Sequence, residues 1–258
     1  MAATLKEIYR YPVKGLSGER LESVALKAGE CIAHDRAWAI EAGGRRFDPA
    51  SPSYLPKANF LMLMRDEKLA ALDTEFDEDS KVLTVLRDGK QVARGNLSEP
   101  LGCSLLEQFF SAYAKESLRG AAPRIVSAAG HSFSDVPMKW VSLINLASVR
   151  ELERVTRKPV HHMRFRGNFY IEGLEPWAEN DWLDKTISIG GKPVLEITER
   201  IQRCAAVNVD PETGERDMNL LRALDAGFGH EDCGVYARVA GDGSVSAGDR
   251  VEVVEEGA

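Results

Sequence analysis

The amino-acid sequence predicts an α+β fold that is predominantly β: an N-terminal β-barrel-like domain followed by a second β-barrel domain with a few helices. Many short segments alternate apolar and polar residues, which is the two-residue period of a half-buried strand. Few segments show the wider spacing of an amphipathic helix, and turn-forming residues separate most of the strands. Numerous short strands with few helices are typical of barrel-like sheets with helical decoration.

The expected strands are short and lie between turn signals. Asp88-Gly89 separates two of them and indicates a two-residue hairpin turn, because both positions of that turn require a positive φ. In the first half, strands are expected at residues 4–9, 21–26, 38–40, 81–86 and 91–93. In the second half, they are expected at residues 140–144, 169–171, 186–189, 194–197, 235–239 and 250–254.

Helices are expected in three places. The clearest covers residues 101–113, where the apolar side chains fall on one stripe. Another covers residues 147–155 with Asn145 as its N-cap, and a short one covers residues 218–224. Residues 115–137 are rich in Gly, Ala, Ser and Pro, which predicts a boundary near residue 120. The expected domains therefore cover residues 1–120 and 121–258.

The overall charge of the chain narrows the classes of partner. Its 258 residues carry a formal net charge of -7 without a Lys/Arg-rich block, so nucleic acid is not an expected partner. We find no signal-peptide core and no stretch near the roughly 20 apolar residues of a membrane span. A cytoplasmic protein without a membrane partner is expected, with reduced Cys31, Cys103, Cys204 and Cys233.

Cys204 is the cysteine with the strongest chemical signal. It follows an expected strand, precedes the turn at residues 210–214, and has Arg200 and Arg203 within four residues. A nearby cation favours the thiolate, which is a soft ligand suited to a heavier metal or to carrying sulfur. From the local sequence alone, the plainer interpretation of a small buried hydrophobic residue is favoured.

Cations beside small or turn-forming residues occur in further segments. Arg164 and Arg166 are separated by one residue, so in an extended stretch both guanidinium groups would face one side and fork onto a phosphate. Lys14 beside Gly15 combines a charge with close backbone approach to an anion, and Arg36 lies in a charged turn. Taken singly, each is better explained as a solvated strand edge or surface turn.

Other candidate sites are rejected. Cys31 and His34 have C-x-x-H spacing, but one such pair supplies only half of a tetrahedral zinc site. The chain has no P-loop, no G-x-G-x-x-G motif and no G-x-S-x-G motif. The sequence therefore gives no support for a P-loop nucleotide-binding protein, a dinucleotide-binding enzyme or an α/β-hydrolase.

Taken together, the segments resemble the MOSC superfamily over nearly the whole chain. The N-terminal half is similar to the β-barrel domain that precedes MOSC in the mitochondrial amidoxime-reducing component and its bacterial relatives, through residues 11–15 and 35–38. The C-terminal half resembles the family in residues 142–148, 164–168 and 176–182 and, most diagnostically, in residues 203–214.

The resemblance implies a molybdenum–molybdopterin cofactor. Cys204 matches the cysteine that ligates molybdenum in the reductase members and is the expected catalytic residue. The expected cofactor-binding residues are Lys14, Gly15, Arg36, Asn145, Ser148, Arg164, Arg166, Asn168 and Arg203. A phosphate-bearing pterin needs cations and backbone donors, and the metal needs a thiolate. The resemblance also carries the family's association with pyridoxal phosphate binding.

The activity implied is the two-electron reduction of N-hydroxylated compounds such as amidoximes, hydroxylamines and N-hydroxylated bases. The metal would supply the oxygen-atom chemistry. The chain has no C-x-x-x-x-C-x-x-C run, so electrons are expected from a separate ferredoxin- or cytochrome-type protein. Two positions depart from the pattern: Gly15 stands where the eukaryotic reductases have serine, and Gly167 where many members have proline.

A non-redox role is the alternative. MOSC domains also occur at the end of molybdenum-cofactor sulfurases, so Cys204 would then carry a persulfide and the partner would be a sulfur donor. Lys14 and Arg36 favour the reductase, because they would complete a reductase-type pocket. The absence of a fused electron-transfer domain favours sulfur carriage. A binding module without chemistry would require all the motifs to be incidental.

Overall fold

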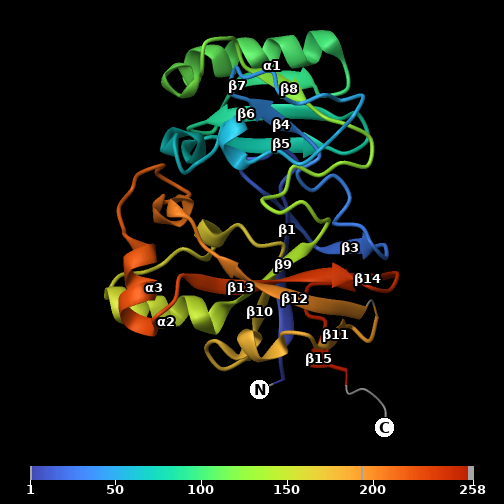
Figure 1. Cartoon of the computed structure of the whole chain (residues 1–258), viewed down its shortest axis with the longest axis vertical. Helices are drawn as coiled ribbons and strands as arrows, with labels where there is room; N and C mark the ends of the chain where they lie inside the picture. The colour runs from blue at the N-terminus through green and yellow to red at the C-terminus, as the bar shows by residue number, and fades with distance from the viewer. Residues whose placement is uncertain (1, 193, 255–258) are drawn as a thin grey trace.

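A computed structural model describes residues 2–192 and 194–254, and its largest element is an eight-stranded sheet that forms the lower lobe in Figure 1. Across this sheet the strands are β15 (Val251–Val253), β11 (Thr186–Ile189), β12 (Val194–Gln202), β13 (Asp232–Val239), β9 (Val141–Asn145), β10 (Phe169–Glu172), β1 (Thr4–Arg10) and β2 (Glu19–Leu21). The pairing of β9 with β10 is parallel, and the other pairings are antiparallel.

The first strand of the chain lies inside the sheet of the second half. β1 is bonded to β2 on one side and to β10 on the other, with Thr4 opposite Glu172 and Ile8 opposite Phe169. A single bridge between Thr4 and Arg250 links β1 toward β15. Within the described residues, this ladder approaches a barrel but does not close into one.

The upper lobe in Figure 1 is built from smaller sheets and one long helix. It holds the three-stranded sheet β5 (Asp73–Asp77), β6 (Val82–Arg87) and β7 (Lys90–Asn96), the pair β4 (Ala39–Glu41) and β8 (Arg124–Val126), and helix α1 (Pro100–Tyr113). Asp88 and Gly89 connect β6 to β7 with φ values of 52° and 71°, which confirms the predicted hairpin turn. The last pair, β3 (Ser23–Leu26) with β14 (Gly243–Ser246), again joins the two ends of the chain.

Two further helices lie beside the large sheet. α2 (Leu146–Thr156) begins at Asn145, whose side chain accepts a hydrogen bond from the Ala147 amide and confirms the predicted N-cap. α3 (Leu220–Phe228) packs against α2. The short 3-10 helices are η1 (Lys57–Asn59), η2 (Glu67–Ala71), η3 (Lys115–Ser117), η4 (His162–Phe165), η5 (Ala178–Trp182) and η6 (Ala205–Asn208).

Separate apolar cores stabilise the two lobes. The large sheet and the β3–β14 pair enclose one core that includes Leu5, Phe169 and Val235. The upper lobe has its own core around Leu106 and Phe110 of α1. Burial of such side chains is the main favourable contribution to the stability of each lobe. No helix among the described residues is both long and apolar enough to cross a membrane.

The described residues form a predominantly β fold with three α-helices, which confirms the predicted fold class. The sequence did not reveal β5, β8 or β14, which are short or rich in polar residues. The strand expected at residues 21–26 is divided at Glu22 into parts of β2 and β3, which pair with different partners. The pairing of β1 and β3 with strands of the second half also crosses the boundary expected near residue 120.

We predict that Gly102→Ala lowers the free energy of unfolding by about 2 kcal/mol, because it overpacks the contact between α1 and β7. A Cβ on Gly102 would lie 2.3 Å from the backbone nitrogen and oxygen of Asn96. This clash outweighs the gain of up to about 1 kcal/mol that alanine normally brings to a helix. Urea denaturation of both proteins measures the difference.

The matched control is Gly227→Ala in α3. The nearest atoms to a Cβ there would belong to the Val155 side chain, with Cγ2 at 3.2 Å. We expect a change in unfolding free energy within about 1 kcal/mol. If both variants lost the same stability, the close contact between α1 and β7 would not be the cause.

Candidate functional site

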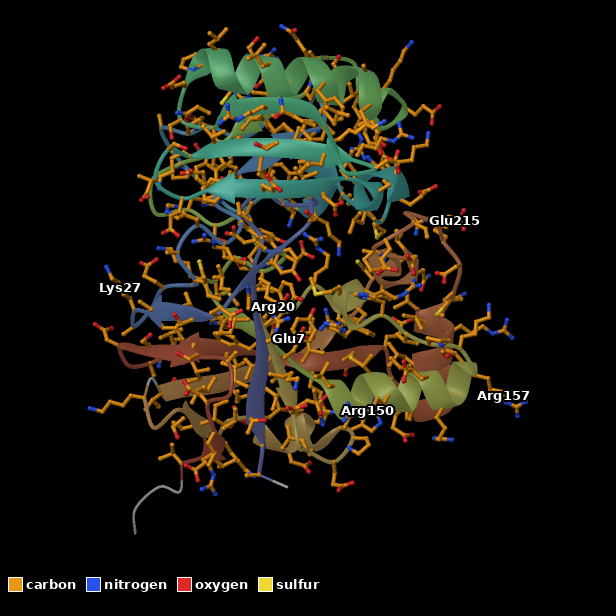
Figure 2. All side chains as sticks on the ribbon, turned by 180° about the vertical axis from the view of Figure 1, so that it is seen from behind. Glu7, Arg20, Lys27, Arg150, Arg157 and Glu215 are labelled. Carbon is orange, nitrogen blue, oxygen red and sulfur yellow. The ribbon has the colours of Figure 1, made fainter. Side chains whose placement is uncertain are left out.

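A cleft of about 430 Å³ lies where the two lobes meet, and both halves of the chain line it. The N-terminal half contributes Lys14, Gly15 and Arg36 among others, while the C-terminal half contributes residues from the 164–168 segment and from the end of β12. The loop after residue 209 also reaches up to the N-terminal lobe, as the labelled Glu215 shows in Figure 2. In this loop, Arg216 Nη2 donates hydrogen bonds to the carbonyl oxygens of Leu63 and Met64, at 2.9 and 2.8 Å.

Cys204 lies in the wall of this cleft. Its backbone is extended at the residue before η6, and its side chain is half-buried. Lys57, in η1 of the N-terminal half, lines the same cleft as Cys204. Although burial acts to lower it, the Asp135 carboxylate and then Cys204 raise the pKa of Lys57. The predicted reactive thiol therefore shares its cleft with a cation that comes from the other lobe, in addition to the arginines near it in the sequence.

Lys14 and Gly15 are in the cleft, as expected. Lys14 Nζ donates to the Phe133 carbonyl at 2.8 Å and to the Asp135 carboxylate. Burial holds the pKa of Lys14 below its ordinary value, and Asp135 offsets part of that effect. Gly15 has a φ of +86°, and a Cβ there would lie 2.7 Å from the Leu61 carbonyl oxygen. A side chain in this position, including the serine of the reductases, would be strained in this backbone.

Arg36 and Arg166 both contact the buried ring of Tyr11. Their guanidinium carbons lie 4.7 and 4.4 Å from the ring centroid. Arg36 also donates to the Arg166 carbonyl at 3.0 Å, and Arg166 donates to the Leu16 carbonyl at 2.6 Å. Both arginines have a positive φ, 52° and 51°. Left-handed backbone at non-glycine residues is concentrated at functional sites.

Arg164 is in the cleft, but not in the way that the sequence predicted. Residues 162–165 form a 3-10 helix and Arg166 is left-handed, so the stretch is not extended and the two arginines have separate environments. Arg164 Nη2 pairs with Asp210 and Asp217, each at 2.8 Å. Its side chain is 1% exposed, and its Nε and Nη1 atoms have no hydrogen-bond partner within the described part of the chain.

Asn168 and Arg203 also line the cleft, and their side chains form hydrogen bonds with other residues of the chain. Asn168 accepts from the Ser142 amide and hydroxyl at 3.1 and 3.0 Å. Arg203 donates to the carbonyls of Cys233 and Phe165 at 2.7 and 2.8 Å.

Asn145 and Ser148 lie outside the cleft. The Asn145 amide donates to the buried carboxylate of Glu179 at 2.7 Å, and the Ser148 hydroxyl donates to the same carboxylate at 2.8 Å. Burial raises the pKa of Glu179 despite these bonds. The structure thus gives this pair another role: together with Glu179, they hold the loop around η5 against the start of α2.

Gly167 marks another departure from the family pattern. A Cβ there would lie 2.4 Å from Cγ1 of Ile144, so any larger residue would require the isoleucine to move. Glycine, where the family has proline, therefore leaves room for the Ile144 side chain in this chain.

Several cleft residues had no motif to identify them. The sequence does not mark Lys57, Asp135, Trp140 or Tyr236 as site residues, because none of them belongs to a functional motif. Trp140 and Tyr236 lie in expected strands, and Lys57 and Asp135 lie outside any expected element. In the sequence, Arg200 is distinguished only by its position four residues before Cys204. Trp140 and Tyr236 form an aromatic pair with ring centroids 5.9 Å apart.

Positive charge exceeds negative charge in this cleft. The cations that line it are Lys14, Arg36, Lys57, Arg164, Arg166, Arg200 and Arg203. The carboxylates in the lining are Asp135 and Glu199, and three more, Asp35, Asp210 and Asp217, pair with lining arginines. Seven cations against five carboxylates leave an excess of positive charge, although the chain as a whole carries -7. Such a cleft favours an anionic ligand.

Comparisons with known proteins agree on the two halves. Residues 2–128 match the family described as "MOSC N-terminal beta barrel domain", and residues 130–252 match "MOSC domain". A "Molybdenum cofactor sulfurase" of Caenorhabditis elegans is 40% identical over 84 residues, or 32% of this chain and 11% of that protein. The sulfurase of Oryza sativa subsp. japonica is 24% identical over 82% of this chain and 29% of its own length.

Among solved structures, the comparison found the YuaD protein from Bacillus subtilis. It is 11% identical, with a TM-score of 0.47, over 98% of this chain and 96% of that chain. The curated relatives are much longer than this chain, which spans about a tenth of the C. elegans protein and under a third of the rice protein.

We predict that a neutral alkylating reagent modifies Cys204 at least a hundredfold faster than Cys233 at pH 8. Burial raises the pKa of Cys233 to about 12, so its reactive thiolate is scarce, and its side chain is enclosed. Cys204 is half-buried and lines the cleft. Mass spectrometry of digested protein after timed labelling measures both rates. Equal rates would contradict the placement of Cys204 in an accessible cleft.

Proposed function

Because the chain is a MOSC domain protein that also carries the MOSC N-terminal beta barrel domain, we propose that it binds a molybdenum–molybdopterin cofactor in the cleft and reduces N-hydroxylated compounds. The observation that carries the proposal is a half-buried thiol, Cys204, in the wall of a cleft with excess positive charge. A phosphate-bearing pterin is anionic, and a heavy metal favours a thiolate ligand.

The unpaired donors of Arg164 support an anionic ligand of this kind. Two nitrogen atoms of a guanidinium group that is 1% exposed have no partner among the described residues. Leaving buried donors unsatisfied is unfavourable, so a phosphate that accepts from both would stabilise the site. Lys14, Arg36 and Arg166 would hold the rest of the pterin, and Cys204 would bind the metal.

The bound cofactor would supply two-electron oxygen-atom chemistry. The residues of the chain bind and orient: Asn168 and Arg203 brace the cleft walls through the Ser142, Cys233 and Phe165 contacts described above. Substrates would be amidoximes, hydroxylamines or N-hydroxylated bases. A separate ferredoxin- or cytochrome-type protein would donate the electrons.

We predict that the wild-type protein, produced in a host that makes molybdopterin, contains close to one molybdenum atom per chain and that Cys204→Ala loses most of it. Removal of the thiolate removes the only ligand that we assign to the metal. Elemental analysis by mass spectrometry, with pterin fluorescence on the same samples, measures both components.

Cys103→Ala is the matched control. Cys103 lies half-buried on α1, outside the cleft lining, so this variant should keep its molybdenum. Wild-type protein without molybdenum and pterin, from a host that loads other molybdenum enzymes, would contradict the proposal.

Sulfur carriage is the second candidate, and the sulfurase relatives favour it. The matched C. elegans and rice proteins are both called molybdenum cofactor sulfurases. In this role Cys204 would carry a persulfide, and the same cations would bind the pterin that receives or presents the sulfur.

The two candidates differ in the mass of the purified protein. Gentle purification without reductant should yield a Cys204 that carries one additional sulfur atom if the protein is a carrier, and an unmodified Cys204 if it is a reductase. Intact-mass measurement on the wild type and Cys204→Ala tests this. An added sulfur in the wild type alone, without bound molybdenum, would replace the reductase proposal with sulfur carriage.

A further inference from the structure

Lys57 and Arg200 are more accessible than the deeper cations Lys14, Arg36 and Arg164. The side chains of Lys14 and Arg164 are 8% and 1% exposed, whereas the Lys57 side chain is 32% exposed and Arg200 is an exposed residue. Lys57 comes from η1 of the N-terminal half, and Arg200 from β12, four residues before Cys204. Both line the same cleft as the thiol. Each side of the entrance therefore carries an accessible cation, and on the β12 side the exposed carboxylate of Glu199 lies next to Arg200 in the sequence.

Lys57 is only partly neutralised. Its ammonium group lies 3.8 Å from Oδ2 of Asp135, while Oδ1 of that carboxylate is bound to Lys14. Asp135 is thus shared between two lysines, and Lys14 holds the shorter contact. The side chains of Cys204 and Tyr236 line the same cleft and also act to raise the pKa of Lys57. Lys57 therefore retains positive charge beside the sulfur.

Arg200 is the other free cation at this entrance. Its backbone pairs with Val235 in the sheet, and its guanidinium group has neither a hydrogen bond nor an ion pair to any residue that the structure describes. Glu199, its neighbour, also lines the cleft but forms no ion pair with it. The guanidinium group is free to accept an anionic group from solvent.

We propose that Lys57 and Arg200 form a subsite that selects reactants bearing a carboxylate or other oxyanion and presents them to Cys204. This inference deepens the proposed function, because it names the class of substrate at the same site. The deeper cations remain with the anionic cofactor, and these two face the incoming reactant. Asp135 opposes the selection, since its carboxylate neutralises part of the charge on Lys57.

The experiment compares two alkylating reagents on the protein without cofactor. Iodoacetate is anionic and iodoacetamide is neutral, and both react by displacement of iodide by the same thiolate. The ratio of their rates at Cys204 therefore cancels any change in thiolate population and reports the local attraction of an anion. Cys103, which is half-buried on α1 and has no cationic partner assigned to it, provides an internal reference ratio in each sample.

We predict that Lys57→Met lowers the iodoacetate-to-iodoacetamide ratio at Cys204 by about fivefold, and that Arg200→Met lowers it by about threefold, as expected for single cations near a partly solvated site. Asp135→Asn should raise the ratio by about twofold, because it removes the competing carboxylate. Added salt should shrink all three differences. Quantitative mass spectrometry of the Cys204 peptide gives the rates, and thermal melting verifies that each variant is folded.

Lys139→Met is the matched control, since Lys139 lies outside the cleft lining and pairs with Glu30. It should leave the ratio unchanged. The proposal is overturned if Lys57→Met and Arg200→Met leave the ratio at the wild-type value, or if Lys139→Met lowers it equally. This outcome does not depend on molybdenum content: a protein that binds no cofactor but shows the predicted ratios would contradict the proposed function and support the subsite.

On cofactor-loaded protein, the same variants provide a test with substrate. Lys57→Met should raise the KM for an aromatic amidoxime with a ring carboxylate several-fold and leave the KM for its uncharged parent nearly unchanged. An equal effect on both compounds would indicate a general loss of the site and would contradict selection by charge.

Discussion

The antiparallel pairing of β1 with β10 is the interaction on which the cleft depends. Because β1 runs along β10, the loop that follows β1 lies beside the loop that precedes β10. Tyr9 completes this junction: its amide donates to the Asn168 carbonyl at 2.7 Å, and its carbonyl accepts from the Asn168 side chain at 3.2 Å. Residues from opposite halves of the sequence are thereby fixed within one wall.

Tyr11 extends this junction into the cleft. Its ring is fully buried and contacts both Arg36 and Arg166. Each of these guanidinium groups also donates a hydrogen bond to a backbone carbonyl oxygen. Guanidinium groups held in this way are oriented before a ligand arrives, which reduces the entropy lost on binding. The left-handed backbone at both arginines is the local strain that this arrangement requires.

Short-range patterns in the sequence predicted the elements that short-range forces determine. The stripe on α1, the Asn145 cap and the Asp88-Gly89 turn are all local, and all three are present. β5 escaped prediction because its side chains are mostly polar and partly or fully exposed, so burial leaves little pattern.

The candidate site could be predicted only where a family motif marked it. Lys57 and Asp135 line the same cleft as Cys204 because the two lobes pack together, and nothing in their own segments signals this placement. The expected parallel arrangement of Arg164 and Arg166 failed because a left-handed residue depends on tertiary contacts that spacing does not encode. Asn145 and Ser148 match a family motif, yet their polar atoms are used by Glu179.

The insertion of β1 between β2 and β10 has a consequence for how the protein acquires its shape. One edge of β1 pairs with β10, and β10 lies more than 150 residues later in the sequence. Loop closure over such a distance is slow compared with the formation of the local hairpin β6–β7. The contacts that join the two family regions, and with them the binding cleft, therefore carry a large loop-closure entropy cost.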